Sequence, residues 1–342
     1  MQEKSSDAKS KILVLLNNYS YFQRDKITGP KSIIQLFSSL VEQGVSITIL
    51  LPGKKPISNF PFNTIIQKLN FSNILRNIIK SKLIIVDRHF FILGWVLSKV
   101  FCKKLCVRLL GLGVHLQSER LLSKRNLIRI LTSISPVDLV ISTLDASSPS
   151  KDLTFMKSKK VIHRINGVEP NIAKQNSNKP LKNLFFFVGR DSQEKGFDEA
   201  LAFFCNLSFS YKKLDVFGLT KLSQSHKIRD NSKKVFLHGF VDNTQICSMT
   251  KDHAFMISGN KLGALGNAEL EALARGKKII YCGDKKYMLS IPKNIIKNYV
   301  HESEWKNINI EKFLQQSCKI QNFFIIHKAD KSAVLELLDG RF

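Results

Sequence analysis

Blocks of apolar residues and polar loops alternate along the first part of the chain and predict strands and helices in turn. Residues 11–16 (KILVLL) form a nearly continuous apolar run, which is typical of a strand covered on both faces. After a polar loop, residues 32–43 place apolar side chains at helical spacing, and Gly44 follows as a helix C-cap would. Residues 45–51 (VSITILL) predict the next strand. This order predicts a right-handed βαβ unit with parallel strands.

The same alternation continues through the chain with one interruption. Residues 171–180 (NIAKQNSNKP) are polar and have no apolar period, which is typical of a linker. Before the linker the pattern predicts strands at 83–86, 105–110, 139–142 and 160–165, and helices at 93–100 and 121–134. After it the pattern predicts strands at 183–189, 213–217, 235–238, 254–258 and 278–281, and helices at 197–206, 244–250 and 267–275.

These elements predict an α/β protein with two tandem Rossmann-like, doubly wound parallel-sheet domains facing across a cleft. We expect an N-terminal domain over residues 1–170, a linker over 171–180 and a C-terminal domain over 181–320. Residues 321–342 are expected to form a helical segment that packs back on the first domain. Ligands of such sheets bind at the carboxyl ends of the strands.

Composition and charge restrict the class of protein. A share of 44% hydrophobic residues is typical of a folded chain. The net charge of +26 indicates either a solvated basic surface or an anionic partner, such as a phosphorylated substrate, an acidic lipid or a nucleic acid. The longest apolar stretch, residues 90–101, is well short of the roughly 20 residues that span a bilayer. The polar N-terminus has no signal-peptide core, and the six scattered cysteines form no zinc motif, so we expect a cytoplasmic protein.

The first motif with candidate chemistry is residues 186–197 (FFVGRDSQEKGF). A predicted strand runs into Gly189, Arg190 follows it, and Lys195 precedes a glycine at the start of a helix. Two cations beside a helix N-terminus suit a diphosphate leaving group, which gains negative charge as its bond breaks. An ordinary βα loop with solvated basic residues is an equal alternative.

The second motif is the glycine-rich segment 258–276 (SGNKLGALGNAELEALARG). Glycines that precede a helix, Gly266 among them, let backbone N–H groups approach a phosphate. Asn267 begins the predicted helix, and its alternative role is that of N-cap. Glu271 is one turn further, within reach of ribose hydroxyls, or it interacts only with the helix dipole. The spacing does not match a dinucleotide fingerprint.

Together these segments resemble glycosyltransferase family 4, a group of retaining, nucleotide-sugar-dependent enzymes with the GT-B fold. The segment from Gly189 and Arg190 to Lys195 is similar to the family's G-R-x4-K-G motif, whose Arg and Lys contact the donor diphosphate. Residues 235–242 (VFLHGFVD) resemble its V-x-F-x-G-x-V stretch, which places the nucleoside base near Gly239. Leu270 and Glu271 match the L-E-A-x-A-x-G signature, whose Glu binds the donor ribose.

Other positions complete or depart from the resemblance. Gly29 stands where the family has a glycine-rich loop near the donor phosphate and the acceptor. The family's first glutamate is replaced by Gly263, and its sugar-pocket histidine is replaced by Leu110. His115 is the nearest histidine and a possible sugar or acceptor contact. The resemblance implies no metal and no other cofactor, since the nucleotide-sugar is a substrate.

The resemblance implies a retaining transferase that moves a sugar from a nucleotide-diphosphate sugar to a hydroxyl. Arg190 and Lys195 would be its catalytic residues, and the acceptor would be a bacterial cell-surface glycan: lipopolysaccharide, capsule or a lipid-linked oligosaccharide. The alternatives are a catalytically weak nucleotide-sugar-binding subunit and a nucleotide-sugar epimerase on the same fold. The chain has no stacking platform or motif for nucleic acid, so a nucleic-acid partner is not expected.

A basic segment also allows peripheral contact with the inner face of the cytoplasmic membrane. It carries four cationic side chains at helical spacing, beside apolar ones that we expect on a single face. The cations are Arg120, Lys124, Arg125 and Arg129, and the apolar residues are Leu121, Leu122, Leu127 and Ile128. A solvated helix face is an equal alternative.

Overall fold

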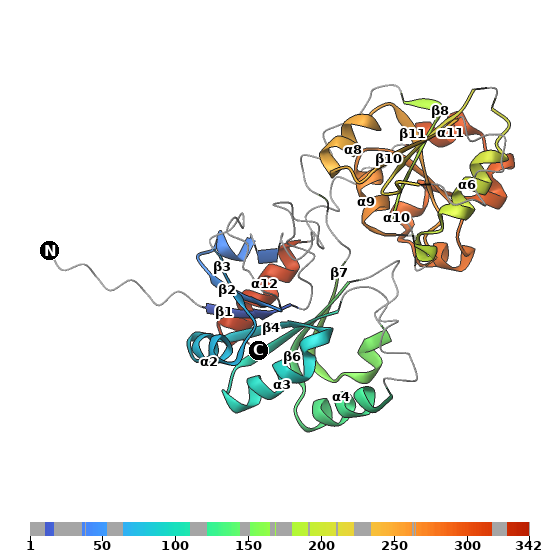
Figure 1. Ribbon diagram of the computed structural model, residues 1–342. Helices are drawn as coiled ribbons and strands as arrows, with labels where there is room; N and C mark the ends of the chain where they lie inside the picture. The colour runs from blue at the N-terminus through green and yellow to red at the C-terminus, as the bar shows by residue number, and fades with distance from the viewer. Residues whose placement is uncertain are drawn as a thin grey trace. The chain divides into compact units, whose positions relative to one another are not determined.

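The chain forms two compact units in the computed structural model (Figure 1), each built on one parallel sheet. The first unit comprises Met1–Leu144, Pro149–Ile165 and Ile326–Phe342, and the second comprises Asp145–Ser148 and Asn166–Ile325. The structure describes residues 11–16, 36–37, 39–52, 64–109, 122–143, 151–164, 168, 180–190, 192–209, 211–221, 234–261, 263, 265–316 and 327–341. Of the predicted linker, 171–180, all but Pro180 lies outside these residues.

The first sheet has seven strands in the order β3-β2-β1-β4-β5-β6-β7, and all its pairings are parallel. The strands are β1 (Lys11–Leu15), β2 (Ser46–Leu51), β3 (Thr64–Lys68), β4 (Leu83–Asp87), β5 (Lys104–Leu109), β6 (Val137–Thr143) and β7 (Ser158–Arg164). The apolar runs of β1 and β4 are buried because helices cover both faces of the sheet.

Separate helices cover the two faces of this sheet. One face packs against α2 (Phe71–Lys80), α3 (Phe91–Val100) and α4 (Leu122–Ile134). The other packs against Leu36, Phe37 and Leu40 and against the C-terminal helix α12 (His327–Leu338), through Val334 and Leu337 of that helix. Figure 1 shows α12 on the opposite side of the sheet from α3 and α4. Two short 3₁₀ turns, Arg88–Phe90 and Lys151–Phe155, complete the described part of the unit.

Helix α4 corrects the face that we expected to be basic and apolar. Ile128 is buried in the core, so it cannot belong to an outward apolar face. The guanidinium groups of Arg125 and Arg129 lie 5.3 and 5.8 Å from the ring centre of Phe155, as cation–π contacts do. Leu127 remains exposed, whereas Arg120 and Leu121 lie outside the described residues.

The second sheet has six parallel strands in the order β10-β9-β8-β11-β12-β13. The strands are β8 (Leu181–Val188), β9 (Lys213–Phe217), β10 (Val235–Gly239), β11 (His253–Ser258), β12 (Lys278–Tyr281) and β13 (Tyr299–His301). Its helices are α6 (Phe197–Cys205), α8 (Asn243–Met249), α9 (Asn267–Ala274), α10 (Lys293–Ile296) and α11 (Ile310–Gln315). The 3₁₀ turns are Gln193–Lys195, Lys285–Ser290 and Glu302–Asn307.

The core of the second unit is rich in phenylalanine. Phe185 of β8 stacks on Phe255 of β11 at 5.6 Å between ring centres, and Phe204 of α6 meets Phe185 edge-on. Trp305 closes the same cluster against Phe255. These aromatic contacts join the two central strands to the helix that follows the first of them. The predicted class, two doubly wound parallel-sheet domains, is therefore confirmed.

A buried carboxylate links three strands of the second sheet. Asp215 of β9 accepts hydrogen bonds from Nε2 of His238 at 2.6 Å and of His253 at 2.8 Å, and Nζ of Lys213 lies 3.0 Å away. Burial by itself would raise the pKa of Asp215, but the hydrogen bonds from His253, His238 and Lys213 outweigh burial and hold the pKa at about 2. The carboxylate therefore stabilises the second unit in its ionised form.

We expect the Asp215 carboxylate to make the second unit sensitive to acid. Because the folded pKa lies below the usual unfolded value of about 3.9, the stabilisation is fully present above pH ~4 and is lost as the pH falls towards 2. Asp215→Asn should therefore cost about 2 kcal/mol at neutral pH and progressively less below pH ~4. Urea denaturation in a Trp95→Phe background, where only Trp305 fluoresces, measures this unit alone. A cost that stays constant with pH would contradict the assignment, and exposed Asp252→Asn is the control.

No described helix is long and apolar enough to cross a membrane.

Candidate functional site

The carboxyl edge of the second sheet carries the first predicted motif. Gly189 ends β8, and its N–H donates to the carbonyl of Phe217 on β9 at 3.0 Å. A Cβ on Gly189 would lie 2.9 Å from the ring of Phe187 and 3.2 Å from Cβ of Lys195. The loop therefore folds back on the end of its own strand and brings Lys195 beside Gly189. Arg190 follows directly, with an exposed side chain.

Gly196 and Gly259 join the two predicted motifs by direct backbone contact. Gly196 adopts a left-handed conformation with φ +60° just before α6, and a Cβ on either glycine would overlap the carbonyl oxygen of the other. Two residues before Gly196 and two residues after Gly259, the loops are joined again, because the N–H of Lys261 donates to the carbonyl of Glu194 at 2.8 Å. The loop after β8 and the loop after β11 therefore form one surface, although about 65 residues separate them in the chain.

Helix α9 begins on this surface, and its N-cap is Gly266. Asn267 is the first helical residue, so the alternative that Asn267 caps the helix is wrong. Leu270 is buried and anchors the helix on the sheet. Gly266 has extended backbone and no side chain, so the N-cap residue itself offers no side-chain acceptor to the first N–H groups of the helix.

Glu269 is a buried carboxylate that the sequence did not assign. It is 4% exposed, and its Oε1 accepts a hydrogen bond of 2.5 Å from the hydroxyl of Ser258 at the end of β11. The other carboxylate oxygen of Glu269, Oε2, would lie 2.7 Å from a Cβ added to Gly266. Glu269 therefore joins the first turn of α9 to the end of β11, and it faces the sheet.

Glu271, by contrast, is directed towards the end of β10. Both its carboxylate oxygens accept hydrogen bonds from the Asn243 amide at the start of α8, at 3.0 and 3.1 Å. Gly239 ends β10 with φ +65°, and its carbonyl accepts from the N–H of Gly218 at the end of β9. Asn243 and Gly218 are thus additional residues of this edge. The sequence could have indicated Gly218, because this glycine directly follows the strand predicted over residues 213–217.

The predicted residues of the second unit therefore lie along one sheet edge. The loop after β8, the end of β10 and the start of α9 supply the described ones: Gly189, Arg190, Lys195, Gly239, Gly266, Asn267, Leu270 and Glu271. The side chain of Leu270 is packed in the core. Gly29 and His115 lie outside the described residues.

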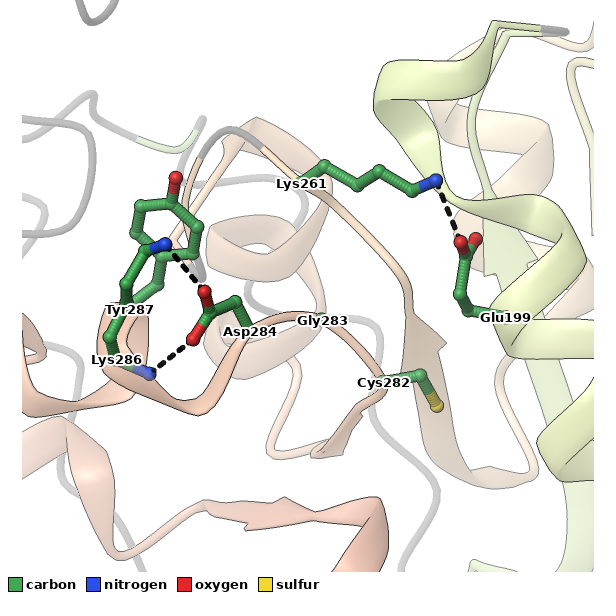
Figure 2. Close-up of a pocket in the computed structure, with 7 residues that line it drawn as sticks. All are labelled: Glu199, Lys261, Cys282, Gly283, Asp284, Lys286 and Tyr287. Carbon is green, nitrogen blue, oxygen red and sulfur yellow. Dashed lines mark hydrogen bonds and ion pairs between the residues drawn. The ribbon is translucent and has the colours of Figure 1, made fainter.

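A pocket of about 390 Å³ opens beside this edge (Figure 2), where the loops after β11 and β12 meet α6. Its charges are paired: Lys261 Nζ lies 2.7 Å from Glu199, and Lys286 Nζ lies 2.5 Å from Asp284. Burial raises the pKa of the Cys282 thiol, so the thiol stays protonated and is no nucleophile. The charged side chains of the pocket are therefore paired with one another.

Within the described ranges, no group of three His, Cys, Asp or Glu side chains could hold a metal ion. The expectation that the chain needs no metal stays a prediction.

Comparison with known proteins adds a family and a fold. The model of the family "Glycosyl transferases group 1" matches residues 168–309. No curated protein matches the chain.

Solved structures match nearly the whole chain at low sequence identity. A glycosyltransferase from Rickettsia africae has a TM-score of 0.63 and 13% identity, over 97% of each chain. Sucrose-phosphate synthase from Thermosynechococcus elongatus has a TM-score of 0.59 and 16% identity, over 96% of this chain and 95% of that one. HepE from Anabaena, solved in complex with UDP and glucose, has a TM-score of 0.59 and 12% identity, over 97% and 98%.

The family match covers the elements that carry Arg190, Lys195 and Glu271, and the structural matches cover both units. The structural matches therefore give the chain the GT-B fold, and residues 168–309 match the model of glycosyl transferases group 1, which indicates a glycosyltransferase.

Proposed function

We propose that the chain transfers a sugar from a nucleotide-diphosphate sugar to a hydroxyl acceptor with retention at the anomeric carbon. The observation that carries the proposal is the joining of the Arg190–Lys195 loop to the loop that opens α9, through Gly196 and Gly259. This surface has two cations and a helix N-terminus whose N-cap is a glycine, which is the chemistry that a diphosphate needs.

In this proposal each group has a separate task. Arg190 and Lys195 neutralise the charge that develops on the departing nucleoside diphosphate. The N–H groups at the start of α9 bind its phosphate oxygens, and Glu271 binds the ribose hydroxyls. Asn243 fixes the Glu271 carboxylate through both oxygens, so the ribose contact is preorganised. The acceptor hydroxyl attacks on the side of the leaving group, and a phosphate oxygen takes its proton.

The acceptor is proposed to be a bacterial cell-surface glycan or its lipid-linked precursor, with the protein at the inner face of the cytoplasmic membrane. The excess of 53 Lys and Arg over 27 Asp and Glu supports an anionic or membrane-associated partner. A nucleotide-sugar-binding subunit with weak activity is the second candidate, because glycine occupies position 263 where the resembling family has its first glutamate.

A thermal-shift screen tests the donor class. The correct UDP-, GDP- or ADP-sugar, at a concentration of about 100 times its Kd, should raise the free energy of unfolding of the chain by about 2.7 kcal/mol. A CMP-sugar carries one phosphate and should stabilise it less. A chain whose melting temperature responds to none of the diphosphate sugars would contradict the proposal. Transfer to acceptor then separates a transferase from a binding subunit, and interconversion of donor without acceptor would indicate an epimerase.

Glu271→Gln should weaken donor binding about tenfold, because one charge-assisted hydrogen bond to the ribose contributes about 1.5 kcal/mol. Titration by calorimetry measures this, with Glu311→Gln as a control on an exposed carboxylate of the same unit. The loss should disappear when the ligand is the 2′,3′-dideoxy nucleotide. An equal loss with both ligands would mean that Glu271 acts only through Asn243 and the fold.

A further inference from the structure

Three neighbouring helices of the first unit expose apolar side chains at their C-terminal ends. Helices α2, α3 and α4 all pack on the same face of the first sheet. On their outer sides, large apolar residues are between 42% and 73% exposed. We call these residues the apolar surface: Ile79 of α2, Val96 and Val100 of α3, and Ile130 and Ile134 of α4.

Two hydrogen bonds show that these helix ends adjoin. The indole N–H of Trp95 on α3 donates to the carbonyl of Ser135, directly after α4, at 3.0 Å. Nζ of Lys103, three residues after α3, donates to the carbonyl of Ile79 on α2 at 3.3 Å. The exposed residues of α3 and α4 are spaced four apart, so each pair lies on one side of its helix. The apolar surface therefore spans three adjoining helix ends.

The charge around the apolar surface is of one sign. Arg76 and Lys80 on α2 and Lys99 on α3 are exposed. None of the three helices contains an Asp or Glu, and residues 64–134 contain 13 Lys or Arg against two Asp or Glu. Lys99 Nζ lies 6.0 Å from the ring centre of Trp95, the residue before Val96.

We propose that the apolar surface docks on an anionic lipid bilayer. Apolar side chains with a cationic border and no acidic residue match an interface of acyl chains beneath anionic headgroups. Lysine is depleted in the cores of protein–protein interfaces, whereas at a membrane its long stem lets the ammonium group reach the headgroups. This face differs from the one that the sequence predicted, since Ile128 packs inward and Ile130 and Ile134 take its place.

The inference deepens the proposed function and rests on it, because a lipid-linked acceptor is presented at such a bilayer. Vesicle binding is measured without donor or acceptor, so the surface and the transferase assignment can each fail alone. The surface belongs to the first unit, whereas the described donor residues belong to the second.

Co-sedimentation with vesicles tests the proposal. The wild-type chain should bind vesicles of phosphatidylglycerol with phosphatidylcholine at low ionic strength. It should bind phosphatidylcholine alone at least about tenfold more weakly, and raising the salt concentration about tenfold should release much of the protein. The double variants Val100→Glu with Ile134→Glu and Lys80→Glu with Lys99→Glu should each lower binding to anionic vesicles at least about tenfold.

The matched control replaces exposed apolar residues of the second unit. Leu289 is 86% exposed and Met249 is 44% exposed, so Leu289→Glu with Met249→Glu adds the same charge away from the apolar surface. This control should lower binding clearly less than Val100→Glu with Ile134→Glu. Because every replaced residue is exposed, circular dichroism and melting temperature should stay close to wild type, which separates lost binding from unfolding.

Two outcomes would overturn the proposal. One is equal vesicle binding by the apolar-surface variants and the matched control. The other is a wild-type dimer in analytical ultracentrifugation that Val100→Glu with Ile134→Glu dissociates, without vesicle binding by the wild type. In that case a second copy of the chain covers the apolar surface.

Discussion

Replacing Arg190 or Lys195 by alanine is expected to lower kcat/KM for sugar transfer about 100- to 1000-fold. In the proposed reaction these two groups stabilise charge that appears only as the glycosidic bond breaks, and removal of one such group costs about 3–4 kcal/mol of transition-state stabilisation. The loss should lie mainly in kcat, because binding of intact donor also uses the N–H groups of α9 and Glu271. Initial rates with the donor found by thermal shift measure both constants.

The control for these variants is Lys306→Ala, which removes an exposed cation from the same unit at a turn beyond the sheet edge. It should leave transfer unchanged, and all three variants should melt near the wild-type temperature. Lys195→Arg should restore part of the lost activity, since it keeps the charge. Transfer at wild-type rates by both alanine variants would refute the proposed mechanism.

Replacing Gly259 by alanine is expected to disrupt the joined loops and with them donor binding. A Cβ at this position would overlap the Gly196 carbonyl oxygen, which belongs to the backbone and cannot rotate away. Overpacking of this kind typically costs about 1–3 kcal/mol, and it would separate the Arg190–Lys195 loop from the start of α9. Donor affinity should therefore fall at least about tenfold, and Trp305 fluorescence should report a less stable second unit.

Gly340→Ala is the matched glycine control for this prediction. Gly340 has φ +73°, and a Cβ added there would meet no atom within 4 Å, so its substitution adds backbone strain without overlap and outside the second unit. It should leave donor affinity unchanged. If Gly259→Ala bound donor as tightly as wild type, the contact between the two loops would not be what forms the site.

Local patterns predicted most of the secondary structure because each buried strand carries its own signal. The runs of β1, β4 and β12 are almost wholly apolar, since helices cover both faces of the sheet at those strands. Strand β3 was not predicted, because it lies at the edge of its sheet, is half exposed and mixes apolar with polar residues. Strand β13 is also an edge strand and has only three residues.

The sequence by itself determined the class of fold, the two motifs and the residue types that could meet a diphosphate, because these depend on neighbours within a few positions. Only the tertiary structure decided which of them meet: Gly196 with Gly259, Glu271 with Asn243, and Glu269 with Ser258. Only it showed that Ile128 faces the core while Ile130 and Ile134 face outward. Such contacts follow from strand order and register between segments far apart in the chain, which no local spacing encodes.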